Sequence, residues 1–147
     1  MSLRTALRRL WQRVKCKGTL DTNTILRYLL QDNEEQARIV EELFKSAREE
    51  GSYFYIPLTV ILELVFVLHK TYRIKKETVA DIIRSLKTIP AEIEKEDIVF
   101  DALELFINGM KFSDAIIYVQ ATREGITPVY TFDREDFKGK PHTVLLG

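Results

Sequence analysis

The chain has 147 residues, of which 46% are hydrophobic and 30% are charged. This length suits one domain with a substantial core, and this balance excludes a disordered chain. Lysine plus arginine and aspartate plus glutamate number 22 each, so the net charge gives no indication of the partner. Cys16 is the only cysteine, which excludes an intramolecular disulfide and a cysteine-based zinc site. We therefore expect a reducing, cytoplasmic setting.

Residues 1–17 form a basic N-terminal extension to a domain that spans residues 18–147. The extension contains no acid, and its cations are Arg4, Arg8, Arg9, Arg13, Lys15 and Lys17. Its apolar residues recur at helical spacing: Leu3, Leu7, Leu10, Trp11 and Val14. Three interpretations of the extension remain open. It forms a helix that binds RNA or a partner, it results from a start codon assigned upstream of true initiation near Val14, or some of its residues are not native.

Neither a secretory signal nor a membrane span is expected. The extension lacks a continuous hydrophobic region. The longest apolar run, residues 60–68, is interrupted by Glu63 and is too short to cross a bilayer.

The remaining elements alternate between strands and helices. Strands are expected up to Leu20 and at residues 53–56, 129–132 and 143–146. Helices are expected around residues 25–30 and at residues 34–50, 59–70, 75–88, 96–107 and 113–125. The helix at 59–70 is apolar nearly all round, which is typical of a buried helix. The alternation predicts an α/β sandwich with a mainly parallel sheet, which places ligands at the carboxyl ends of its strands.

Glu63 is the most informative acid, because it interrupts the apolar helix at 59–70. A buried carboxylate is costly to ionise unless it meets a cation or a metal. An ion pair with a lysine or arginine, or a position on an exposed flank of the helix, explains it equally well.

Three aspartates stand at the ends of strands or the start of a helix. Asp21 follows the first strand, Asp133 follows the strand at 129–132, and Asp114 begins the helix at 113–125. Each alone is well explained as a cap, a turn residue or a partner of the helix dipole. Together with Glu63 they are expected at one edge, where their mutual repulsion favours a bound divalent cation. Oxygen ligands favour Mg²⁺ or Mn²⁺, which can activate water for phosphodiester hydrolysis.

Four stretches in order resemble the PIN domain, in particular the toxin ribonucleases of VapBC-type toxin–antitoxin pairs. They are residues 20–29, 56–64, 112–116 and 130–137, and the resemblance covers residues 18–147. It implies a three-layer α/β/α sandwich with a central, mainly parallel sheet of four or five strands. It also implies that Asp21, Glu63, Asp114 and Asp133 occupy the acidic, metal-binding catalytic positions. Asn23 and Thr131 match polar positions at the pocket rim. Asp136 is a further possible acid there, but the favoured interpretation of Asp136 is a solvated loop residue.

The resemblance implies a Mg²⁺- or Mn²⁺-dependent endoribonuclease toxin with an RNA substrate, a small cognate antitoxin and a homodimeric state. A PIN-type RNA-processing nuclease without an antitoxin is the nearest alternative, and a non-catalytic protein-binding module is another. A phosphatase with an aspartate nucleophile is disfavoured, because Asn23 stands where such an enzyme needs a second acid.

Overall fold

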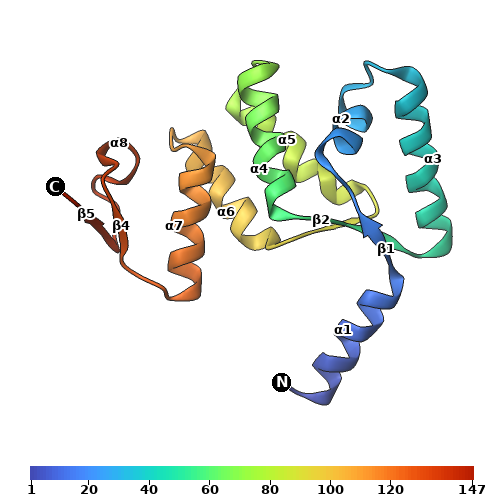
Figure 1. Ribbon diagram of the computed structural model, residues 1–147, viewed down its shortest axis with the longest axis horizontal. Helices are drawn as coiled ribbons and strands as arrows, with labels where there is room; N and C mark the ends of the chain where they lie inside the picture. The colour runs from blue at the N-terminus through green and yellow to red at the C-terminus, as the bar shows by residue number, and fades with distance from the viewer. The chain divides into compact units, whose positions relative to one another are not determined.

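The computed structural model describes residues 1–10 and 15–147 completely, and residues 11–14 by their backbone alone. The side chains of Trp11, Arg13 and Val14, which belong to the expected basic helix, therefore lie outside the described residues. The chain divides into two compact units (Figure 1). The first comprises Met1–Leu64 and Ser85–Glu94, and the second comprises Val65–Arg84 and Lys95–Gly147. Each unit is described by itself.

The first unit is built on a three-stranded parallel sheet. Its strands are β1 (Cys16–Thr19), β2 (Tyr53–Ile56) and β3 (Ala91–Ile93), in the order β1-β2-β3. Its helices are α1 (Leu3–Lys15), α2 (Thr22–Leu30), α3 (Glu34–Glu50), the 3₁₀ turn η2 (Leu86–Thr88) and most of α4 (Leu58–Phe66). Leu20 extends the pairing of β1, since its N–H donates to the Tyr55 carbonyl oxygen at 2.9 Å.

Local sequence signals set the helix boundaries of this unit. Asp21 and Asn33 have extended backbones and cap α2 and α3, with side-chain oxygens that accept from the N–H groups of Thr24 and Gln36. Gly51 ends α3 with a φ of +68°, a left-handed conformation that glycine adopts without steric cost. These caps fix the chain at the carboxyl end of β1 and at the start of β2.

The core of the first unit forms between the sheet and its helices. Phe44 is 1% exposed, and its ring packs edge-on to Tyr28 and tilted against Phe54. The sheet and α4 contribute Ile56, Ile61 and Leu64, which are fully buried.

The second unit is mainly helical. It contains the π-helical turn η1 (Val67–Thr71), α5 (Lys76–Ser85, up to Arg84), α6 (Glu96–Ile107), α7 (Phe112–Glu124) and α8 (Arg134–Phe137). Strands β4 (Val129–Thr131) and β5 (Thr143–Leu145) pair in parallel, with Tyr130 opposite Val144. Helices α6 and α7 lie side by side (Figure 1). The ring of Phe106, on α6, packs edge-on to the ring of Phe112, on α7.

The mixed α/β class with parallel strands is confirmed, but the number of strands in the sheet is lower than predicted. Over the described residues, the five strands form one three-stranded and one two-stranded sheet in place of a single sheet of four or five strands. Two elements were missed: β3, which is three residues long and follows Pro90, and the single-turn α8. Both are too short to carry a periodic signal, and strand partners are chosen by tertiary contacts.

The helix expected at residues 59–70 differs from the prediction in two respects. The α-helix ends at Phe66 and continues as the π-helical turn η1. It is not buried all round, because Thr59, Glu63 and Phe66 are exposed. Of the alternatives that the sequence left open, Glu63 therefore occupies the exposed flank of the helix and is not a buried carboxylate.

Among the described residues, no helix combines the length and the apolar character needed to span a lipid bilayer.

Candidate active site

Three aspartates of the second unit form a compact carboxylate cluster. Asp114, Asp133 and Asp136 each offer a carboxylate oxygen that lies within 4.8 Å of the others. Asp114 and Asp133 are half-buried, and Asp136 is buried at 9% exposure. The sequence predicted the first two as ligands. It favoured a solvated loop position for Asp136, with the pocket rim as the alternative, and the first of these predictions is wrong because Asp136 is buried beside the other two.

The end of β4 places two of these carboxylates. Asp133 caps α8, and its Oδ1 accepts a hydrogen bond from the N–H of Asp136 at 3.0 Å. The N–H of Asp133 in turn donates to the hydroxyl oxygen of Thr131 at 3.0 Å. Thr131, which was predicted at the pocket rim, thus orients the turn that carries Asp133. One helical turn then brings Asp136 to the same side as its cap.

The start of α7 supplies the third carboxylate. Asp114 lies in the first turn of α7, and the N–H of Lys111, at the N-cap of that helix, donates to Asp136 Oδ2 at 3.3 Å. This hydrogen bond ties α8 to the beginning of α7. Phe112 and Ala115 are buried on either side of Asp114 in sequence, so the helix cannot rotate its acid away without exposing them.

Electrostatic repulsion is strong in this cluster. The pKa of Asp114 is raised from 3.8 to about 6, first by burial, then by a hydrogen bond with Asp136 that favours the protonated form of Asp114, and by the negative charges of Asp136 and Asp133. The positive charge of Lys111 opposes this rise in pKa. None of the ion pairs formed by the described residues involves these three aspartates.

The donor chemistry fits a hard divalent cation. Three carboxylates at close range, one of them held partly protonated near neutral pH, are stabilised by a cation that lets all of them ionise. Oxygen ligands without cysteine or histidine suit Mg²⁺ or Mn²⁺ better than zinc or copper. Asp114, Asp133 and Asp136 are the residues of this unit that would hold such an ion.

The first unit brings together two further predicted residues. The hydroxyl of Thr22, the first residue of α2, donates to Oε2 of Glu63 on α4 at 2.6 Å. Asp21 immediately precedes Thr22, and its Oδ1 accepts from the N–H of Thr24 at 2.9 Å. A hydrogen bond from the Thr24 side chain and, after it, the one from the Thr24 N–H lower the pKa of Asp21 below its usual range, so this carboxylate is ionised at neutral pH. Both Asp21 and Glu63 are exposed.

Asn23 is engaged in a different contact. Its side-chain oxygen accepts from the Arg27 guanidinium at 3.2 Å, and Arg27 forms an ion pair with Asp32 at 2.9 Å. Within this unit Asn23 therefore anchors the arginine of α2.

Two residues with a positioning role were missed from the sequence. Thr22 holds Glu63, and its only signal was its place between Asp21 and Asn23. Glu94 follows β3, and its carboxylate accepts from the Tyr55 hydroxyl at 2.8 Å and from the Leu58 N–H at 2.9 Å. It thereby fixes the beginning of α4, the helix that carries Glu63. An acid after a strand is a recognisable signal, but β3 itself was not predicted.

The amino-acid sequence also matches a known family. The PIN domain family matches residues 19–141, a range that contains every acid described above. The chain belongs to the PIN domain family. The resemblance stated from the sequence is thereby confirmed.

One curated relative of this PIN domain is a VapC ribonuclease from Aquifex aeolicus (strain VF5). The two are 26% identical over 117 residues, which are 78% of this chain and 86% of the relative. Among solved structures, a chain of a toxin-antitoxin complex from Klebsiella pneumoniae is 25% identical to this chain. The alignment covers 87% of this chain and 96% of the other chain, with a TM-score of 0.33.

Proposed function

We propose that this PIN domain is a VapC-type, Mg²⁺- or Mn²⁺-dependent endoribonuclease that hydrolyses RNA phosphodiesters. The observation that carries the proposal is the carboxylate cluster of Asp114, Asp133 and Asp136, whose geometry and raised pKa fit a divalent cation. The similarity to a VapC ribonuclease supports RNA as the substrate.

The residues take distinct parts in this proposal. Asp114 and Asp133 would hold the metal ion, and Asp136 would join them as a further ligand or would accept a hydrogen bond from water at the site. A bound Mg²⁺ or Mn²⁺ supplies an activated water and stabilises charge on the phosphodiester. Lys111 lies beside the cluster and is placed to attract a phosphate without reading sequence.

Asp21 and Glu63 complete the proposed set of catalytic carboxylates. Hydrogen bonds with Thr24 lower the pKa of Asp21, and the Thr22 hydroxyl orients Glu63. We propose that both are required for the same reaction, as the sequence stretches around them predict. Thr22 is then a positioning residue for Glu63, and Thr131 is one for Asp133.

The decisive experiment is cleavage of total cellular RNA with Mg²⁺ or Mn²⁺, with and without EDTA. We expect cleavage that EDTA abolishes and that Asp114→Asn, Asp21→Asn and Glu63→Gln each reduce by at least about a hundredfold, while circular dichroism shows the fold retained. Asp97→Asn is the matched control, since Asp97 is an exposed acid in the first turn of α6. Cleavage that survives both EDTA and Asp114→Asn would overturn the metal site.

We further propose a small cognate antitoxin and a cytoplasmic location, as is implied by the resemblance to VapBC toxins. A short reading frame beside the gene should encode a protein that copurifies with this chain and inhibits its cleavage of RNA. If no such frame exists, or if its product leaves cleavage unchanged, the toxin assignment fails while the nuclease assignment stands.

A further inference from the structure

Helix α1 presents an apolar stripe to solvent within a basic segment. Leu3, Leu7 and Leu10 are 76%, 49% and 60% exposed, and their spacing places them on one face of the helix. The flanking arginines are also exposed, namely Arg4, Arg8 and Arg9. The helix is well started, because the Ser2 hydroxyl oxygen accepts from the Thr5 N–H at 3.2 Å. A formed helix with three exposed leucines indicates a missing apolar partner.

Helix α3 presents the complementary surface in the same unit. Its inner face is buried, but Ile39 and Leu43 on its outer face are 57% and 39% exposed. Glu35 and Glu42 stand four residues before and three residues after Ile39, so they share its face. Glu50 stands seven residues after Leu43, two turns further along that face.

The charges of the two helices are opposite. Helix α3 contains six glutamates and three basic residues. The basic extension, residues 1–17, contains six cations and no acid. Residues 18–147 therefore contain the other sixteen cations and all 22 acids. Packing α1 on α3 would bury leucines against Ile39 and Leu43 and would place arginines beside glutamates.

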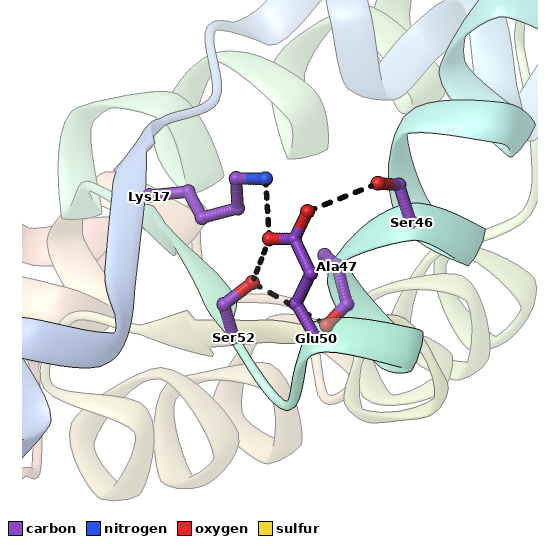
Figure 2. Close-up of polar contacts among 5 residues, drawn as sticks. All are labelled: Lys17, Ser46, Ala47, Glu50 and Ser52. Carbon is purple, nitrogen blue, oxygen red and sulfur yellow. Dashed lines mark hydrogen bonds and ion pairs between the residues drawn. The ribbon is translucent and has the colours of Figure 1, made fainter.

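One contact already joins the basic segment to this acidic face (Figure 2). Lys17, two residues after α1, forms an ion pair with Glu50 at 2.7 Å. Glu50 is also held by the hydroxyl groups of Ser46 and Ser52, at 3.3 and 3.4 Å. The lysine and both hydroxyls lower the pKa of Glu50, so this end of the face stays charged.

The α1 helix of a chain cannot reach its own α3 without losing structure. Helix α1 ends at Lys15 and β1 begins at Cys16, so no linker residue separates them. Cys16 is already paired with Tyr53 in the sheet. A second copy meets no such restriction.

We propose that α1 of one copy packs against the outer face of α3 in a second copy, reciprocally, so that two chains exchange their basic N-terminal helices. A two-fold dimer of this kind uses the same pair of surfaces twice. A membrane or RNA as the partner of α1 accounts for fewer of these features. The glutamates of α3 would repel an anionic membrane. Contacts between the arginines of α1 and RNA phosphates would leave its leucines exposed. The proposal concerns assembly and does not rest on ribonuclease activity.

The first test is the oligomeric state of the full chain, measured by sedimentation or light scattering. The 17.2 kDa chain should run as a dimer. Leu7→Asp and Leu43→Asp should each raise the dimer Kd at least about tenfold, because each places a charge in the buried seam. Thr5→Asp is the matched control on α1, since Thr5 lies away from the leucine stripe. A monomeric chain, or a dimer that Leu7→Asp leaves unchanged, would overturn the proposal.

The second test separates exchange between copies from docking within one chain. In a Cys16→Ser background, a tagged Leu7→Cys chain is mixed with an untagged Leu43→Cys chain under mild oxidation. We expect a disulfide-linked species of both chains, and none when Thr5→Cys replaces Leu7→Cys. The Leu7→Cys/Leu43→Cys double variant should likewise link between copies. A disulfide that forms only within one chain would overturn the proposal. It would also be overturned if the chain bound anionic vesicles through α1 and the Leu7→Cys and Leu43→Cys chains formed no disulfide with each other.

Discussion

Replacing Asp114 by asparagine should change how the stability of the metal-free protein depends on pH. The pKa of Asp114 is raised from 3.8 to about 6, mainly by burial and by Asp136. Because the folded state binds this proton more tightly than the unfolded state does, its contribution to stability is complete below pH 3.8. That contribution is lost as the pH rises through about 6. The Asp114→Asn variant has no proton to lose at this position.

The magnitude follows from the same pKa values. A rise from 3.8 to about 6 corresponds to about 3 kcal/mol, at about 1.4 kcal/mol per pKa unit. Asp114 is only half-buried, so solvent screening reduces the effect, and we expect roughly 1–2 kcal/mol. In EDTA at pH 7.5, Asp114→Asn should therefore be more stable than the native chain by this amount. At pH 4 the two should be nearly equal.

Urea unfolding from pH 4 to 7.5, in EDTA and in Mn²⁺, measures this difference. Mn²⁺ should stabilise the native chain above pH 6 and stabilise Asp114→Asn much less, because the variant lacks one ligand. Asp97→Asn serves as the control and should follow the native pH profile. The reasoning is refuted if, in EDTA, Asp114→Asn and the native chain lose the same free energy of unfolding between pH 4 and 7.5.

Three other substitutions test the folding and positioning contacts. Phe44→Ala should lower the free energy of unfolding by about 3–5 kcal/mol in urea, because Phe44 is 1% exposed and packs against two aromatic rings. Asn33→Ala should cost about 1 kcal/mol through loss of the α3 cap to Gln36, and Asn33→Asp should restore most of it. Thr22→Val should reduce RNA cleavage about tenfold at unchanged stability, because Glu63 loses its 2.6 Å hydrogen bond, whereas Thr22→Ser should retain cleavage.

Each of these has an outcome that contradicts it. Phe44→Ala with a loss under about 1 kcal/mol would mean that the first unit does not depend on this aromatic core. If Asn33→Ala has the stability of the native chain, the Asn33 cap does not stabilise α3. Equal cleavage by Thr22→Val and Thr22→Ser would show that the hydroxyl does not position Glu63.

Much of the secondary structure follows from local sequence. Gly51, Asn33 and Asp21 mark helix boundaries through their own backbone preferences and side-chain hydrogen bonds. Helix α3 is recognisable because its buried residues recur every three or four positions. By contrast, β3 and α8 last three and four residues, which is too short for a periodic pattern. Their existence depends on contacts with β2 and with the turn after β4.

The acids of the candidate site also fall into those that the sequence placed and those that only the structure placed. The sequence by itself determined that Asp21, Asp114 and Asp133 stand at strand ends or a helix start, since these positions depend on neighbours along the chain. Only the tertiary structure decided that Asp136 is buried beside Asp114 and Asp133, that Glu63 is exposed, and that Thr22 holds it. Burial and side-chain partners arise when segments distant in sequence pack together. An apolar run around Glu63 could not reveal which face of α4 meets a neighbour.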